Sequence, residues 1–417
     1  MHSLTLDVVD PLQRAQPAIP IGLPILVKMA FDGADLSSVW NTLVDRINND
    51  PYDAAALIDL STIAHIQGRP GDRIALQNAA LELQRVYRQL PEISAPDGIR
   101  LLAFMVPGNF LANTPLEFLL CGSDITLDML YVLPGQPLPQ PLPEHDIALV
   151  AITELEENQA VLREIAALVP SWPRPVVNAP DRIARLTRDG AWALLNSVEG
   201  VAMPMTARVE RSSLMQIASG ELKIEAILEN SAFPIIARPL DSHAGEGLAK
   251  LDVHTALDSY LDERLEMEFF ISPFVDYRGS DGLFRKYRIA LIEGHPYACH
   301  MGISQHWMIH YVNADMYKNA ERRAEEAHFM AHFDDFSIQH DKALRAIAER
   351  IGLDYVTMDC AEMPDGRLLI FEVGNGMIVH AMDHPDLFPY KRPQMDKVFS
   401  AFQMMLRNAS KAKQTTI

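Results

Sequence analysis

The segment Phe371-Glu372-Val373-Gly374-Asn375-Gly376 decides the fold together with Thr357-Met358-Asp359-Cys360, which lies just before it in the chain. Between them is Pro364-Asp365-Gly366-Arg367, and Asp-Gly between two apolar runs is a strong hairpin signal. If Asp-Gly forms a two-residue loop, the register puts Asp359 opposite Glu372, with Cβ atoms about 5 Å apart on one face. The neighbouring side chains are then predicted to face the core: Met358, Cys360, Phe371 and Val373.

Two carboxylates that face each other on apolar strands repel, and a bound divalent cation is the usual reason to tolerate them. Asn375 supplies a third oxygen nearby in the sequence. A ligand set made of oxygen alone favours Mg²⁺. The hairpin therefore predicts a magnesium site at Asp359, Glu372 and Asn375. The alternative is an exposed hairpin whose acids form salt bridges.

The composition bounds the class of protein. The chain has 417 residues, of which 48% are hydrophobic, and this is ordinary for a soluble globular protein of two or three domains. The formal net charge of −19 argues against nucleic acid or an anionic membrane as the main partner. No signal peptide and no apolar run of about 18 residues is visible. The three cysteines are scattered, without metal or disulfide spacing, so we expect a cytoplasmic protein: Cys121, Cys299 and Cys360.

The first part of the chain is predicted to form an extended arm and a small helical region. Prolines punctuate residues 1–32, and beyond them apolar residues recur with helical spacing. Helices are expected over 36–47, 53–68 and 72–90. The helical region, 33–95, resembles a tetratricopeptide repeat, but it holds little more than one such unit, and about three are needed for a solenoid. It is either a partner-binding module or a helical cap packed on the next domain.

Residues 96–180 are predicted to form an open α/β layer. Continuous apolar runs indicate buried parallel strands that alternate with helices. The loop after the first strand, which contains Asn109, is a place where ligands gather in such layers. It has a single glycine, Gly108, so a dinucleotide fingerprint is absent. The expected strands and helices are 99–106, 125–132, 146–152 and 175–177, and 116–120 and 156–169.

A second informative stretch, 233–247, indicates a strand that ends in Arg238 and continues into a glycine-containing loop. Glycines let backbone N–H groups approach phosphate oxygens, and the guanidinium adds a fixed positive charge. Downstream, the apolar run 269–275 contains a proline, which indicates an irregular strand and a hinge whose backbone could read an adenine edge. Lys286 and Arg288 share one face of the next strand and favour an anion there. The alternative is a solvated strand edge.

Three histidines lie in an insert rich in Trp and Tyr: His300, His306 and His310. Their spacing could suggest zinc, but no Cys or Asp joins them at a familiar ligand spacing. The insert could instead form a polar-aromatic substrate wall, or the histidines could pack in the interior. The sequence leaves these alternatives open.

These parts, in this order, resemble an ATP-grasp enzyme over residues 100–405. The similarity is greatest to the branch with glutathione synthetase and the ribosomal-protein glutamate-adding ligases, and to bacterial proteins that join a tetratricopeptide-like N-terminus to such a domain. The resemblance implies an α+β fold: a pre-ATP-grasp α/β domain at 96–180 and an ATP-grasp domain at 181–408. Within the latter, 181–272 would be the first subdomain, with the glycine loop, and 273–408 the metal-binding subdomain.

The resemblance also implies ATP and Mg²⁺ as cofactors, with Mn²⁺ as a substitute, and assigns roles to residues. The metal ligands would be Asp359, Glu372 and Asn375, and the catalytic cations Lys286 and Arg288. Nucleotide contacts would come from Arg238, Ser242, His243, Ala244, Gly245, Gly247, Ile271, Phe274, Asp276 and Lys286. The acid and amine substrates would meet His300, His306, His310, Asn313 and Asn109.

Three residues depart from the family pattern. Arg238 replaces a lysine, and an earlier phosphate-contacting lysine falls near Asp189-Gly190, where Arg188 or Arg185 could stand in, or no residue does. The usual Glu-x-Asn metal motif has one extra residue between Glu372 and Asn375.

The activity implied by the resemblance is formation of an amide or peptide bond between a carboxylate and an amine through an acyl phosphate. The substrates would be small molecules or peptides, a protein partner would dock on the N-terminal helices, and many relatives are homo-oligomers. Two alternatives are a non-catalytic ATP-binding scaffold and an ATP-dependent phosphotransferase.

Overall fold

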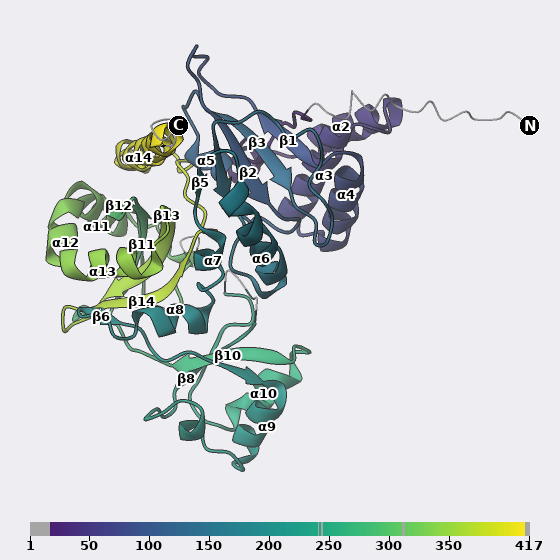
Figure 1. Ribbon diagram of the computed structural model, residues 1–417. Coiled ribbons are helices and arrows are strands. Elements are labelled where there is room, and N and C mark those ends of the chain that lie inside the picture. Colours follow the sequence, from purple (N-terminus) through teal and green to yellow (C-terminus); the bar gives the residue numbers. More distant parts are fainter. Residues whose placement is uncertain (1–16, 241, 243–244, 311–312, 413–417) are drawn as a thin grey trace, which may run out of the picture.

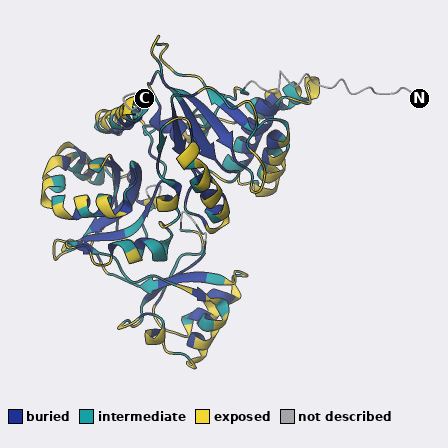
Figure 2. Ribbon diagram, viewed as in Figure 1, coloured by how far each residue is buried: buried dark blue, intermediate teal, exposed yellow. Residues whose placement is uncertain are grey.

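The computed structural model of the chain describes residues 17–240, 242, 245–310 and 313–412. Within this part of the chain three β-sheets form, one beside the N-terminal helices, one at the opposite end of the molecule and one between them in the view of Figure 1. Buried residues follow the strands, whereas exposed residues cover the outer faces of the helices (Figure 2). Among the described residues, no helix is both long and apolar enough to cross a membrane.

Four helices precede the first sheet: α1 (Leu23–Phe31), α2 (Ser37–Asn49), α3 (Ala54–Ile66) and α4 (Pro70–Leu83). Asp53 caps α3, because its carboxylate accepts a hydrogen bond from the Ala56 N–H at 2.9 Å. Apolar residues of α3 and α4, among them Leu57 and Leu81, join the core of the following domain. The helical region is thus present and packs as a cap on its neighbour. The predicted extended arm differs in part, since α1 begins at Leu23.

The first sheet has the strand order β1-β3-β2-β4-β5. Its strands are β1 (Val86–Gln89), β2 (Arg100–Met105), β3 (Thr126–Tyr131), β4 (Ile147–Val150) and β5 (Val176–Val177). All neighbours pair in parallel except β1, which runs antiparallel to β3. Helices α5 (Leu116–Leu119) and α6 (Gln159–Leu168) connect the strands, as the α/β prediction requires. The helix predicted over 72–90 is too long, because β1 occupies its last residues.

The second sheet is antiparallel, with the order β7-β10-β8-β9. Its strands are β7 (Ala207–Glu210), β8 (Ile235–Pro239), β9 (Ala249–Leu251) and β10 (Glu268–Pro273). Helices α9 (Arg211–Ser219) and α10 (Ala256–Asp262) cover one face and enclose a separate small core that includes Leu214 and Phe269. Between α9 and β8 the chain forms only a short 3₁₀ turn, Ile224–Ala226.

The third sheet has the order β12-β11-β13-β14-β6. Its strands are β6 (Val201–Ala202), β11 (Phe284–Ile292), β12 (His295–Ser304), β13 (Tyr355–Glu362) and β14 (Leu368–Gly374). Its helices are α7 (Pro180–Ile183), α8 (Arg188–Leu195), α11 (Ala320–Ala331), α12 (Phe333–Gln339), α13 (Asp341–Ile351) and α14 (Lys391–Ala412). The sequence analysis placed the whole segment 181–272 in the first subdomain. The start of this segment belongs instead to the third sheet, because β6 pairs in parallel with β14.

The β13–β14 hairpin has the predicted pairing but not the predicted loop. The Gly366 N–H donates to the Met363 carbonyl and the Met363 N–H to the Arg367 carbonyl, both at 2.9 Å, so three residues form the loop. This shifts the register by one residue. A bulge at Phe371 shifts it back, and Asp359 faces Glu372 as predicted. Phe371 itself is half-buried and packs against the core, where it contacts the buried Tyr277 ring.

The layout is an α/β domain followed by two α+β units, which is the order of domains that the sequence resemblance implies. The α/β domain and the third sheet meet closely where β14 ends. A Cβ atom at Gly376 would lie 2.5 Å from Thr153 Cγ2 and 3.1 Å from the Leu111 carbonyl oxygen. A side chain of any size at Gly376 would therefore push these two parts of the molecule apart.

We expect Gly376→Ala to lower the free energy of unfolding by about 1–3 kcal/mol, because the added methyl group overpacks this contact. Thermal or urea denaturation measures the effect. Gly71→Ala is the matched control, since no atom lies within 4 Å of the added Cβ. The control should be neutral or slightly stabilising on its helix. An equal loss of stability in both variants would contradict the close contact at Gly376.

Candidate functional site

A cavity of about 630 Å³ lies between the second and third sheets and reaches the end of the first. Side chains from β8, β10, β11, β13 and β14 line it, together with residues of α8 and of the loops after β4 and β12. Charged groups collect where β11, β13 and β14 run side by side. The charged residues that argue for a ligand here are Arg188, Arg238, Lys286, Arg288, Asp359 and Glu372.

Asp359 is the buried centre of this charged group. Its side chain is almost fully enclosed, yet it accepts three hydrogen bonds from β11: from Lys286 Nζ at 2.9 Å and from Arg288 Nε and Nη2 at 2.8 and 3.0 Å. Burial by itself raises the pKa of Asp359, but Arg288 and Lys286 more than offset it and hold the pKa well below the usual range. The predicted shared face of Lys286 and Arg288 is confirmed.

Glu372 faces Asp359 across the hairpin and forms an ion pair with Arg188, at the start of α8. Burial raises its pKa, whereas Arg188, Arg238 and Lys286 lower it, and the net result is a pKa of about 2. Both carboxylates are therefore ionised at neutral pH. Of Arg188 and Arg185, the two residues that could stand in for the lysine of the family pattern, Arg188 lines the cavity.

Arg238 closes the same end of the cavity from β8. Its guanidinium donates to the Ser242 hydroxyl at 3.0 Å and also to the Ser242 carbonyl, so it holds the first residue of the glycine loop. Burial and the nearby Arg188 lower the pKa of Arg238 to about 9. Ser242 and Gly245 line the cavity, whereas Gly247 does not, and its carbonyl accepts a hydrogen bond from Tyr260. The predicted contacts at His243 and Ala244 lie outside the described residues.

The predicted hinge is only partly correct. Phe274 lines the cavity and packs edge-to-face on Trp307, with ring centroids 5.7 Å apart. Ile271 instead belongs to the core of the second sheet, since residues alternate between the two faces of β10. Asp276 is exposed and pairs with Arg278 at 2.6 Å, away from the lining. The side chains of Ile271 and Asp276 therefore do not line the cavity, and the predicted backbone contact of the hinge stays a prediction.

The predicted substrate residues separate into three groups. His300 and His310 line the cavity, and burial and neighbouring cations lower the pKa of both. His306 and Asn313 are exposed and do not line it; Asn313 Oδ1 accepts a hydrogen bond from the His310 N–H. Asn109 lies in a different cavity, near the N-terminal helices. Among the described residues, there is no group of three His, Cys, Asp or Glu side chains placed to hold a metal.

Asn375 is anchored to the α/β domain through its amide nitrogen. It is fully buried, and its Nδ2 lies 3.1 Å from the Thr114 hydroxyl and 3.0 Å from the Ile152 carbonyl, both in the α/β domain. The extra residue between Glu372 and Asn375 carries the chain past the end of β14 before the amide is placed. Among the described residues, its Oδ1 is buried without a hydrogen-bond partner, so the metal role predicted for Asn375 stays a prediction, while its Nδ2 helps to fix two domains together.

Several lining residues were not predicted from the sequence. Thr153 and Glu154 follow β4, and a Cβ at Gly374 would lie 3.3 Å from both Glu154 carboxylate oxygens. Phe110 comes from the loop after β2, and His65 from α3 in the helical region. Thr153, Glu154 and Phe110 agree with one general rule, that ligands gather beyond the carboxyl ends of parallel strands. Nothing in the sequence pointed to His65.

The donor set at the hairpin suits a hard divalent cation bound together with phosphates. Asp359 and Glu372 are ionised, adjacent and offer only oxygen atoms. Mg²⁺ in phosphate-transferring sites commonly takes one or two carboxylates and completes its shell with substrate phosphates and water. Two carboxylates therefore suffice here, without Asn375.

Comparison with known proteins found no matching protein-family model and no matching curated protein. Solved structures do match. One is the D-Ala:D-Ser ligase VanG from Enterococcus faecalis, 12% identical, with a TM-score of 0.47, over 74% of this chain and 100% of that one. Another is an ATP-grasp RimK-domain protein from Sphaerobacter thermophilus, 18% identical, with a TM-score of 0.40, over 74% of this chain and 99% of that one. The fold assignment itself rests on the sheet topology of this chain.

Replacing Asp359 should destabilise the protein, because Asp359 neutralises two partly buried cations. Asp359→Asn leaves Lys286 and Arg288 without their carboxylate, and we expect a loss of about 3–5 kcal/mol in the free energy of unfolding. Because the pKa of Asp359 is lowered by folding, its contribution is complete above the ordinary value of 3.8 and is lost as the pH falls below it. The difference between wild type and variant should therefore shrink in acid.

The matched control is Asp365→Asn, in the loop of the same hairpin. Asp365 pairs only with Arg367, and both side chains are half exposed, so this change should cost less than about 0.5 kcal/mol. Urea denaturation at several pH values measures both variants. Similar losses for the two substitutions would show that the buried pair does not hold the site together.

Proposed function

We propose that this chain is an ATP- and Mg²⁺-dependent carboxylate–amine ligase that works through an acyl phosphate. The observation that carries this proposal is the group of four cations around two ionised carboxylates at one end of a cavity of about 630 Å³. Clustered cations favour a polyphosphate, and the carboxylates favour the metal that accompanies it. Cavities of this size are typical of small-molecule and cofactor sites.

The residues divide into nucleotide-binding and charge-neutralising roles. Arg238 and Lys286 would contact the α- and β-phosphates, while the backbone of 272–275 and the Phe274 and Trp307 rings would enclose the base. Bound at Asp359 and Glu372, Mg²⁺ would neutralise charge between the β- and γ-phosphates. Arg288, fixed by Asp359, would face the transferred phosphoryl group. These groups are preorganised by their mutual hydrogen bonds, which is what electrostatic stabilisation of a transition state requires.

The proposed reaction has two steps. A substrate carboxylate oxygen attacks the γ-phosphorus, and the bond to ADP breaks. An amine then attacks the carbonyl carbon of the acyl phosphate, loses a proton, and releases inorganic phosphate as the amide forms. Water must be kept from the acyl phosphate. Met203, Ile236, Leu248 and Ile370 supply the apolar part of the lining that would exclude it.

The test is ADP release by the purified chain with Mg²⁺, ATP and pools of amino acids and other carboxylates. We expect release that depends on a carboxylate–amine pair and yields an amide. Glu372→Gln should reduce it by about 100-fold or more, because it removes a charged oxygen ligand. Glu349→Gln, an exposed change on α13, is the matched control and should leave the rate unchanged.

The products also separate the alternative functions. A stable phosphoester in place of an amide would indicate a phosphotransferase. ATP binding without turnover in every pool would favour a non-catalytic scaffold. Equal rates for Glu372→Gln and wild type would contradict the assignment of the site.

A further inference from the structure

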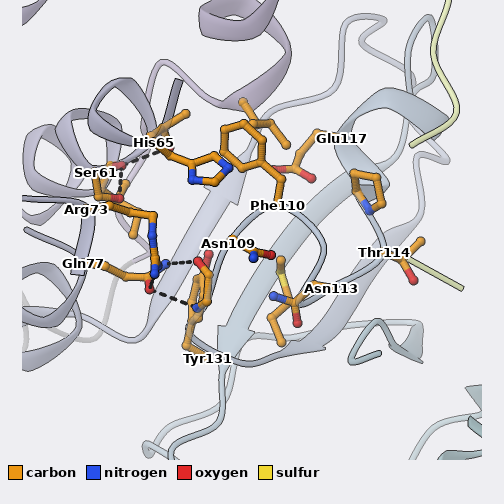
Figure 3. A pocket seen from close by; sticks show the side chains of 16 residues that line it. Ser61, His65, Arg73, Gln77, Asn109, Phe110, Asn113, Thr114, Glu117 and Tyr131 are labelled. Atoms are coloured by element: carbon orange, nitrogen blue, oxygen red, sulfur yellow. Dashed lines mark hydrogen bonds between the residues drawn. The ribbon is translucent and has the colours of Figure 1, made fainter. Parts of the chain in front are cut away.

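A second, smaller cavity of about 70 Å³ lies between the N-terminal helices and the first sheet (Figure 3). Residues at the carboxyl ends of β2 and β3, including Met105 and Tyr131, form one side, and residues of α3, α4 and α5 form the rest. Ligands of open α/β sheets bind beyond the carboxyl ends of the strands. Here the helical region covers that position, so the cavity exists only because the two parts are joined.

Four polar groups of this cavity have little or nothing to bind within the protein. Arg73, on α4, makes one long hydrogen bond to Gln77 Oε1 at 3.4 Å, and among the described residues it has no ion pair. In the same part of the chain, the Glu117 carboxylate accepts a hydrogen bond only from its own backbone N–H, and the side chains of His65 and Tyr131 make no hydrogen bond to a protein group. Partly buried polar and charged groups are costly without partners. Such a set of groups in one cavity therefore indicates a polar ligand.

The two charged groups occupy different sides of the cavity. Figure 3 shows Arg73 and Gln77 on the side of the helical region and Glu117 on the other side, with Asn109 and Phe110 between them. Burial raises the pKa of Glu117 to about 7, so an ammonium group beside it would favour the ionised form. A ligand with an anionic end and a cationic end matches this separation of charge.

Other hydrogen bonds hold the walls of the cavity in place. Gln77 binds both the N–H and the carbonyl of Gly108, at 2.9 and 3.1 Å. Asn113 binds both the N–H and the carbonyl of Val106, at 2.8 Å each. The loop after β2 is thereby fixed to α4 on one side and to its own strand on the other. A fixed wall lowers the entropic cost of binding a ligand.

The small cavity adjoins the large one. His65 and Phe110 line both, and their rings are in contact, with centroids 4.1 Å apart. A cavity needs about 10–15 Å³ to hold one water molecule. The small cavity, at about 70 Å³, therefore has room for roughly five or six atoms the size of a water oxygen. That is close to the number of non-hydrogen atoms in a small amino acid.

We propose that this cavity binds a small zwitterionic amino acid, with its carboxylate on Arg73 and His65 and its ammonium on Glu117 and Tyr131. The role of this amino acid as a substrate rests on the proposed ligase function. In that role, it would pass His65 and Phe110 to reach the phosphates in the large cavity. Binding of the amino acid depends only on the residues that line the small cavity. The helical region then serves as a wall of a substrate site.

The test is calorimetric titration of the nucleotide-free chain with glycine, L-alanine, D-alanine, β-alanine and L-serine. At least one should bind the wild type, and acetate and ethylamine should bind much more weakly, since each carries one of the two charges. Arg73→Met and Glu117→Gln should each weaken binding by about tenfold or more, because a charge-assisted contact is lost. Arg163→Met and Glu82→Gln, both at exposed positions, are the matched controls and should bind as the wild type does.

Binding of Mg²⁺–ATP is measured on the same samples, so the two proposals fail separately. Amino-acid binding without Mg²⁺–ATP binding would contradict the ligase and leave this site in place. Folded wild type that binds none of the five amino acids, or binding that neither pocket variant weakens, would overturn the site. Circular dichroism confirms folding, and Tyr131→Phe replaces Glu117→Gln if the latter does not fold.

Discussion

The buried charge pairing between β11 and the hairpin is the constraint on which the site depends. Asp359 is enclosed by protein, and a carboxylate there is tolerated because Arg288 and Lys286 donate three hydrogen bonds to it. Glu372, directly opposite, would repel Asp359 without its own partner, Arg188. The cations and carboxylates thus hold one another in a place from which water is largely excluded. The same arrangement leaves a cationic surface for a polyphosphate and an oxygen pair for its metal.

A second constraint ties this charged centre to the α/β domain. Immediately after β14, Asn375 is buried against Thr114 and the end of β4, and Gly376 packs on Thr153. The carboxylates and the loops of the first sheet are therefore placed relative to each other by two consecutive residues that follow β14, Asn375 and Gly376. This explains why lining groups from three sheets, and one from the N-terminal helices, meet around one cavity.

The sequence predicted the elements with regular patterns well. Continuous apolar runs located the parallel strands, and the Asp-Gly turn located the hairpin and the pair of Asp359 with Glu372. The predicted pair is correct, although the predicted two-residue loop is wrong. The three-residue loop shifts the register by one residue, and the bulge at Phe371 shifts it back. The alternation of apolar and polar residues does not predict a bulge of this kind, because a bulge costs little and is decided by tertiary packing.

Other features depend on contacts between distant segments. The short strand β1 was predicted as helix because its apolar residues fit either period, and its pairing with β3 decides the outcome. Pairing of β6 with β14 moved a domain boundary in the same way. Asn375 was read as a ligand from its distance along the chain, while its partners come from more than 200 residues earlier in the sequence. His65 reaches the cavities only because the helical region packs on the first sheet.

The most direct test of the central claim is equilibrium binding of ATP to the wild-type chain, measured by calorimetry with Mg²⁺ and then with the metal removed by a chelator. If Asp359 and Glu372 hold the metal between the phosphates, ATP binds in the presence of Mg²⁺ and binds at least about tenfold more weakly without it. ATP binding that is absent, or that does not depend on the metal, would contradict this account of the charged centre.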